Sequence, residues 1–126
     1  MASSIRIEVE KLPTQYINIK VNSEIYKDFQ IRCKQQNIPM NVVIEAFARQ
    51  YVNGRYKLHE NDILKWENIP ITKEDSVLNT AINKKVYNKF KEIVQIQEYY
   101  MRYVLLAFIE DYGKRKLVME FVEDDM

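Results

Sequence analysis

The sequence predicts an α+β protein, mostly helical, in which one strand–helix–helix pattern occurs twice. Three observations lead to this fold class. The chain aligns with itself at an offset of 61 residues, so that residues 16–51 meet residues 77–112 without a gap. Each copy begins with alternating apolar and polar residues, which is typical of a strand with one buried face. Two segments with apolar residues at helical spacing follow in each copy and predict two amphipathic helices.

The internal repeat rests on ten identities in 36 aligned positions. Many of the other pairs exchange one apolar residue for another, as Ile17 and Leu78 do. The identical pairs are Asn18/Asn79, Asn22/Asn83, Tyr26/Tyr87, Phe29/Phe90, Gln36/Gln97, Met40/Met101, Val43/Val104, Ala46/Ala107, Phe47/Phe108 and Tyr51/Tyr112. A match of this extent within one chain indicates that the two copies share a structure.

The expected strand of the first copy is residues 16–22, YINIKVN. Its apolar face holds Ile17, Ile19 and Val21, and its polar face holds Tyr16, Asn18 and Lys20. In the second copy, VLNTAIN, the same register places Val77, Asn79 and Ala81 on the outer face. Of these three, only Asn79 has a side chain that forms hydrogen bonds, so the second strand has the weaker polar face.

Two helices are expected after each strand. Asn22 or Ser23 suits the N-cap of the first helix, and an apolar stripe then recurs every four residues. The stripe is Ile25, Phe29 and Cys33 in the first copy, and Val86, Phe90 and Val94 in the second. The second helix is expected over residues 40–52, because Pro39 suits a helix start and Gly54 a helix end. Its equivalent in the second copy begins at Met101 and ends at Gly113.

The composition argues against an enzyme. One Cys and one His make neither a disulfide framework nor a metal site by themselves. We expect Cys33 to be a core residue, since Val94 stands at its equivalent position, and His59 to be exposed or capping. No paired-carboxylate, phosphate-loop or catalytic-triad spacing occurs. The sequence therefore predicts no catalytic residue, no metal, no cofactor and no small-molecule substrate.

The apolar segments are too short for a membrane protein. No apolar run approaches the ~20 residues that span a bilayer. The first residues, MASSIRIEVEK, also lack the apolar core of a signal peptide. We therefore expect a soluble, cytoplasmic protein without a membrane partner.

The charge is unevenly distributed along the chain. The formal net charge is only +1, yet residues 16–54 carry +2 and residues 76–116 carry +4. Residues 55–75 carry −1, and the last ten residues contain four acids and no base. The two basic modules suit an anionic partner.

A single strand with two helices leaves both strand edges unpaired and is too small to bury an adequate core. Two such units can pair their strands and interlock their helices. With the turn NIPMN and the helix MNVVIEAFARQYV, the pattern resembles the ribbon-helix-helix family of DNA-binding proteins. The resemblance covers residues 16–54 and, less closely, residues 76–113. It implies tandem ribbon-helix-helix units that form an intramolecular pseudo-dimer with a two-stranded antiparallel ribbon and four interlocked helices.

The resemblance also implies a site. In this family the ribbon enters the major groove, and its outward side chains contact base edges. The implied base-contacting residues are Tyr16, Asn18, Lys20 and Asn79. The start of the second helix holds a phosphate in this family, which implies Met40 and Asn41 in one unit and Met101 and Arg102 in the other. Pro39 and Tyr100 stand where the family usually has a small hydroxyl residue.

Basic residues outside the helix starts add to the expected phosphate contacts. Lys84 and Lys85 belong to the more basic second unit and suit attachment to phosphates without sequence choice. The expected organisation is a strand-like arm (residues 1–15), a first unit (16–54), a linker (55–75), a second unit (76–113) and an acidic tail (114–126). In the linker we expect a short helix that places Leu64 and Trp66 or Ile69 against the core.

The expected function is a sequence-specific transcription regulator that binds double-stranded DNA. Tandem units in one chain resemble transcription regulators of hyperthermophilic archaeal viruses, which would place the protein in the host cytoplasm. One ribbon makes few base contacts, so we expect self-association on DNA and cooperative binding to adjacent sites. Two alternatives stay open: a protein-interaction module such as an antitoxin, and an accessory DNA-binding protein of a plasmid relaxosome.

Overall fold

Two strands and the helices that follow them make up most of the fold. The computed structural model describes residues 13–114. Its elements in chain order are β1 (Thr14–Val21), α1 (Ser23–Gln36), α2 (Met40–Val52), α3 (Glu60–Leu64), the 3₁₀ helix η1 (Lys65–Asn68), β2 (Ser76–Asn83), α4 (Lys84–Ile96) and α5 (Met101–Gly113). Residues 1–12 of the expected arm (1–15) and residues 115–126 of the expected tail (114–126) lie outside the described residues.

β1 and β2 form one antiparallel ribbon, to which each repeat contributes one strand. Asn18 pairs with Asn79 at its centre, Tyr16 with Ala81 toward one end and Lys20 with Val77 toward the other. One face is turned into the protein and holds buried side chains, among them Ile17, Val21, Leu78, Thr80 and Ile82. The alternation of a strand therefore turns the other set of side chains toward solvent.

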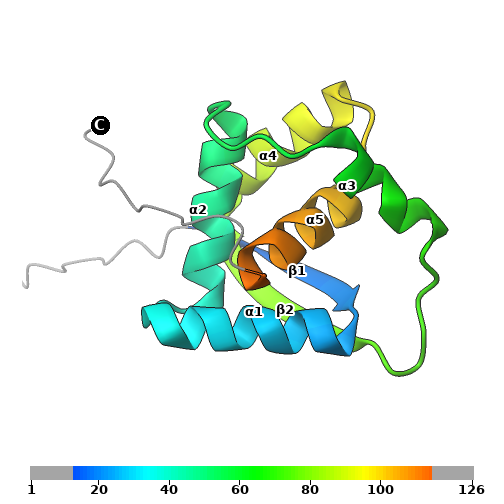
Figure 1. The fold of residues 1–126 in the computed structure, drawn as a ribbon. Coiled ribbons are helices and arrows are strands. Elements are labelled where there is room, and N and C mark those ends of the chain that lie inside the picture. The colour runs from blue at the N-terminus through cyan, green and yellow to red at the C-terminus, as the bar shows by residue number, and fades with distance from the viewer. Residues whose placement is uncertain (1–12, 115–126) are drawn as a thin grey trace, which may run out of the picture.

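The helices of the two repeats pack against one another more extensively than within their own repeat. α1 lies against α5, and α2 lies against α4 (Figure 1). Gly113 permits the close approach of α5 to α1, because a Cβ atom there would lie 3.1 Å from the backbone nitrogen of Phe29. Because each helix packs mainly against a helix of the other repeat, both repeats share one hydrophobic core.

The centre of the core consists of reciprocal contacts between the repeats. The rings of Phe47 and Phe108, which are equivalent residues, stack with centroids 4.0 Å apart and planes 10° apart. The hydroxyl of Tyr51 donates to Gln97 Oε1, and the hydroxyl of Tyr112 donates to Gln36 Oε1. Each repeat therefore makes the same contact to the other.

The predicted tandem ribbon-helix-helix pseudo-dimer with four helices is wrong, although the coarser class, α+β and mostly helical, holds. The described residues form five α-helices around a single ribbon. The fifth, α3, continues into η1, and both pack against α5. Ile63 and Trp66 are 1% and 4% exposed, so this segment is part of the core rather than a covering of it.

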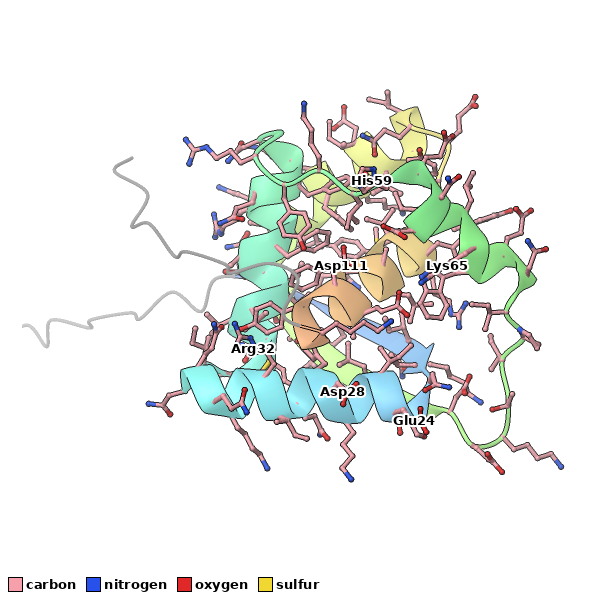
Figure 2. All side chains as sticks on the ribbon, viewed as in Figure 1. Glu24, Asp28, Arg32, His59, Lys65 and Asp111 are labelled. Carbon is pink, nitrogen blue, oxygen red and sulfur yellow. The ribbon has the colours of Figure 1, made fainter. Side chains whose placement is uncertain are left out.

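The expected linker contacts differ in detail from those in the structure. Leu64 and Ile69 are exposed, and Ile63 is buried in their place, together with the expected Trp66. An ion pair between Lys65, which is labelled in Figure 2, and Glu110 ties η1 to α5. Burial tends to raise the pKa of Glu110, but hydrogen bonds and charge from Lys65 and Lys114 hold it below its ordinary value. Apolar burial and a charged contact thus both anchor the segment to the second repeat.

Candidate nucleic-acid interface

The solvent-facing side of the ribbon, called the outer face here, gathers the four residues expected to contact bases. Its residues are Thr14, Tyr16, Asn18 and Lys20 on β1, and Val77, Asn79 and Ala81 on β2. Tyr16 is 77% exposed, and Asn18, Lys20 and Asn79 are exposed as well. The ribbon therefore presents amide, ammonium and phenol groups on one surface while its opposite face is buried.

Asn18 and Asn79 occupy the centre of the outer face, where they are directly paired across the ribbon. The repeat offset exchanges these two residues, so the approximate two-fold axis that relates the repeats passes between them. Thr14 also lies on the outer face, although the sequence pattern predicted a strand that begins only at Tyr16. Thr14 continues the period-two spacing of Tyr16, Asn18 and Lys20, and that spacing could have predicted its place on the outer face.

The start of α2 flanks the ribbon on the β2 side. A cavity of about 350 Å³ between them is lined by Tyr16, Met40, Asn41, Asn79, Thr80 and Ala81. The N–H groups of Val42 and Val43 donate to the carbonyl of Pro39, so the helical ladder begins with them. The preceding N–H groups, of Met40 and Asn41, belong to the helix start, where an anion is stabilised.

The start of α5 flanks the ribbon on the β1 side in the same way. A cavity of about 270 Å³ is lined by Tyr16, Ile17, Asn18, Ile19, Tyr87, Met101, Arg102 and Leu105. The N–H groups of Tyr103 and Val104 donate to the carbonyl of Tyr100. The preceding N–H groups, of Met101 and Arg102, therefore belong to the helix start, as those of Met40 and Asn41 do in α2. Arg102 Nη2 donates to the carbonyl of Lys20 at 3.2 Å, so this guanidinium is anchored to the ribbon.

The helix starts beside the outer face differ from those that follow the strands. Asn22 Oδ1 accepts from Glu24 N at 3.0 Å, and Asn83 Oδ1 accepts from Lys85 N at 2.9 Å, so side chains cap α1 and α4. No side chain caps α2 or α5, whose N-cap residues are Pro39 and Tyr100. α3 also lacks a side-chain cap. The starts of α2 and α5 both border the ribbon, and the lack of a cap leaves them available to an anionic ligand.

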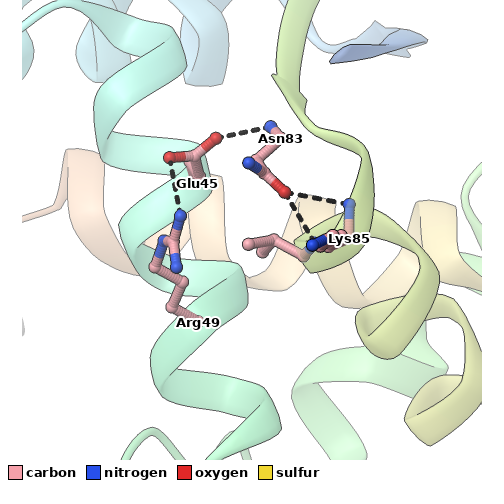
Figure 3. A network of polar contacts seen from close by, with 5 residues as sticks. Glu45, Arg49, Asn83 and Lys85 are labelled. Carbon is pink, nitrogen blue, oxygen red and sulfur yellow. Dashed lines mark hydrogen bonds and ion pairs between the residues drawn. The ribbon is translucent and has the colours of Figure 1, made fainter. Parts of the chain in front are cut away.

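Lys84 and Lys85 lie at the end of the ribbon where Thr14 pairs with Asn83. Both side chains are exposed, while the backbone N–H of Lys84 donates to the carbonyl of Pro13 at 2.9 Å. Glu45 Oε1 accepts from the Asn83 backbone N–H, and its other oxygen pairs with Arg49 (Figure 3). The backbone is thereby fixed at this end, and the two ammonium groups extend from a rigid base.

Arg49 accompanies Lys85 and Lys89 at this end of the ribbon and was not expected there from the sequence. A cavity of about 260 Å³ is lined by Arg49, Val52, Asn53, Asn83, Lys85, Val86 and Lys89. Arg49 comes from α2 of the first repeat, and the lysines come from α4 of the second. Sequence spacing gave no signal for this grouping, because it depends on the packing of α2 against α4.

Two further kinds of site, a metal centre and a reactive thiol, concern the His, Cys, Asp and Glu side chains of residues 13–114. No group of three or more His, Cys, Asp or Glu side chains within residues 13–114 could hold a metal ion. Burial raises the pKa of the Cys33 thiol to about 11, which keeps it protonated and unreactive at neutral pH.

No helix among residues 13–114 is long and apolar enough to cross a membrane.

Comparisons of the chain with protein-family models, with curated proteins and with solved structures give no match. The assignment of a function therefore depends on the geometry and chemistry of the outer face and the helix starts around it.

Proposed function

We propose that the protein binds double-stranded DNA sequence-specifically and regulates transcription, with the β1–β2 ribbon lying in the major groove. The observation that carries this proposal is the outer face, on which Tyr16, Asn18, Lys20 and Asn79 are exposed together. Side chains that the fold does not need for its core are free to bind a ligand. The resemblance of residues 16–54 to ribbon-helix-helix regulators is a second support.

The dimensions of the ribbon suit the groove. Two paired strands are about 4.8 Å apart, and the major groove is about 12 Å wide, so a ribbon with its side chains fits. Asparagine can donate to and accept from adenine, and lysine can donate to the two acceptors of guanine. The outer face thus carries groups that distinguish base pairs.

The flanking helix starts suit the two phosphate backbones that border the groove. The amides of Met40 and Asn41 lie on the β2 side, and those of Met101 and Arg102 on the β1 side. A helix start stabilises a phosphate through its N–H groups and its dipole. Lys84 and Lys85 would add phosphate contacts beyond the end of the ribbon.

The same geometry supports cooperative binding of several chains. Tyr16 to Lys20 spans four residue steps, about 14 Å of strand, which corresponds to roughly four base pairs at about 3.4 Å each. So short a sequence recurs often in any genome, so adjacent copies would be needed for useful specificity. The proposal implies a cytoplasmic location, in a host cell if the protein is viral.

Binding to duplex DNA at increasing salt concentration tests the proposal. Phosphate contacts from Lys84, Lys85 and Arg102 would give a slope of log K against log salt of roughly −3. The double variant Lys84→Ala/Lys85→Ala should reduce this slope by about 2 and leave the preferred sequence unchanged. DNase footprinting upstream of the protein's own gene would locate the operator. Binding that is absent, or indifferent to salt, would contradict the proposal.

A further inference from the structure

The outer face is symmetric at its centre and asymmetric at both ends. The repeat offset exchanges Asn18 with Asn79, which are alike, but it exchanges Lys20 with Ala81 and Tyr16 with Val77. An operator that reads the same on both strands requires equal side chains at exchanged positions. The ribbon of this single chain meets that condition only at its central pair.

Resting on the proposed DNA binding, we infer that the ribbon recognises a non-palindromic site and that Val77 and Ala81 specify thymine through its methyl group. Both residues lie on the outer face of β2, the strand with the fewer polar groups. Their side chains offer the groove no hydrogen bond. In the major groove the apolar group that such side chains can contact is the thymine C5-methyl.

Val77 is the stronger of the two thymine contacts. Its side chain is 46% exposed in a ribbon whose inward residues Leu78 and Ile82 are almost completely buried. It is paired with Lys20, whose ammonium group can donate to both guanine acceptors. This end of the ribbon therefore specifies guanine through β1 and thymine through β2.

The other end of the ribbon combines Tyr16 with Ala81. Tyr16 contributes a hydroxyl group, which donates and accepts, and Ala81 contributes a single methyl group next to it. Neither residue has the charge of Lys20, so guanine is favoured at one end of the site only. The expected operator has a nearly symmetric centre, guanine on one flank, and thymine methyl groups under β2 on both flanks.

Selection from a library of random duplexes with the full-length protein gives the first test. The selected sequence should be non-palindromic, with guanine on one flank only. Thymines of that duplex are then replaced one at a time by uracil, which removes only the methyl group. Under Val77 or Ala81 each replacement should weaken binding about fourfold, the factor that corresponds to ~0.8 kcal/mol for a buried methyl-sized group. Thymines elsewhere should tolerate the replacement.

Variants assign the effect to residues. Val77→Ser should bind the thymine and uracil duplexes equally at the position under Val77, because the side chain that contacts the methyl group is gone. Ile69→Ser is the matched control, because Ile69 is 43% exposed but lies outside the ribbon. It should keep the fourfold discrimination, and circular dichroism should show both variants folded.

The outcomes separate the inference from the function on which it rests. A palindromic selected sequence, or equal binding of thymine and uracil duplexes at every position, overturns the inference and leaves DNA binding intact. Discrimination that persists in Val77→Ser and Ala81→Ser alike overturns the assignment to β2. Failure to bind any duplex overturns the inference together with the proposed function.

Discussion

The two strand–helix–helix repeats agree most closely in the contacts that build the core and the helix ends, and they differ most at the two exposed ends of the ribbon. In both, an asparagine caps the first helix, and a tyrosine hydroxyl donates to a glutamine of the other repeat. Both also turn between their helices through a residue with positive φ, Asn37 at 56° and Glu98 at 63°. The shared positions are those on which the common core and the helix ends depend.

The differences gather on the surface proposed to bind DNA. On the outer face, Tyr16 and Lys20 of β1 stand where β2 has Val77 and Ala81. At the helix that follows the strand, Glu24 and Asp28 of α1 (Figure 2) stand where α4 has lysines. In the proposed interface, one repeat would therefore supply most of the groups for base contacts, and the other more of the charge for phosphates. A duplicated fold can divide one interface in this way without altering its core.

The largest effect is expected where the repeats are most alike. Phe47→Ala and Phe108→Ala each remove one ring of the central stack and should each lower the free energy of unfolding by about 3–5 kcal/mol. Urea denaturation followed by circular dichroism measures the loss. If the alanine variants do not fold, the leucine variants at both positions keep the comparison measurable. A large loss at one position and almost none at the other would mean that the repeats do not share the core equally.

The next largest loss of stability is expected in the packing of α3 against α5 of the second repeat. Ile63→Ala in α3 should cost about 2–3 kcal/mol, because the side chain is 1% exposed and its removal leaves a cavity beside α5. The adjacent Leu64→Ala, at a side chain that is 38% exposed, should stay within about 0.5 kcal/mol of the parent. Equal costs at the two positions would show that α3 is not anchored as the structure has it.

This pair of residues also marks how far the sequence could predict the fold. The strands and four of the helices follow from periodicity and caps: α2 spans Met40–Val52, within the expected range of residues 40–52. α3 is only five residues long, too short for its apolar face to be distinguished by spacing. Which of Ile63 and Leu64 is buried depends on α5, which is distant in sequence.

The candidate site was predictable to a similar degree. Alternation in YINIKVN predicts which side chains of β1 face outward, and the repeat transfers that register to β2. The pairing of Asn18 with Asn79 and the grouping of Arg49 with Lys89 depend on how the repeats dock, which no local pattern contains. Local chemistry was therefore accessible from the sequence itself. The meeting of both strands in one antiparallel ribbon was expected only through the family resemblance, and the grouping of Arg49 with Lys89 was not expected at all.

A smaller effect should appear in binding rather than in stability. Lys20→Ala removes the cation of the outer face and should cost about 1–3 kcal/mol of discrimination between the operator and other duplexes. Lys27→Ala, an exposed lysine on α1, is the control and should keep that discrimination. Competition binding measures both, with circular dichroism to confirm the fold. Loss of specificity in Val77→Ala together with a harmless Lys20→Ala would assign base contacts mainly to β2.

A small effect on stability is expected from exchanging the residue types at Asn37 and Glu98, the equivalent positions in the turns between the two helices of each repeat. Glu98 adopts a positive φ that asparagine tolerates better, so Glu98→Asn should stabilise the protein by about 0.5–1 kcal/mol. Asn37→Glu, the reverse change at the equivalent position, should destabilise it by a similar amount. Denaturation curves of the two variants test the symmetry of the turns. A destabilising Glu98→Asn would mean that the Glu98 side chain makes a contact that outweighs the backbone preference.

The smallest effect on stability is expected for Cys33→Val, which gives the first repeat the residue that the second repeat has at Val94. Val94 is buried at the equivalent position of α4, so Cys33→Val should change stability by less than about 1 kcal/mol and leave DNA binding unaltered. Alkylation of the parent protein should be slow at neutral pH, since the pKa of about 11 leaves little thiolate, and should become fast only on unfolding. Fast alkylation of the folded protein, or loss of DNA binding in Cys33→Val, would give the thiol a chemical role that its burial argues against.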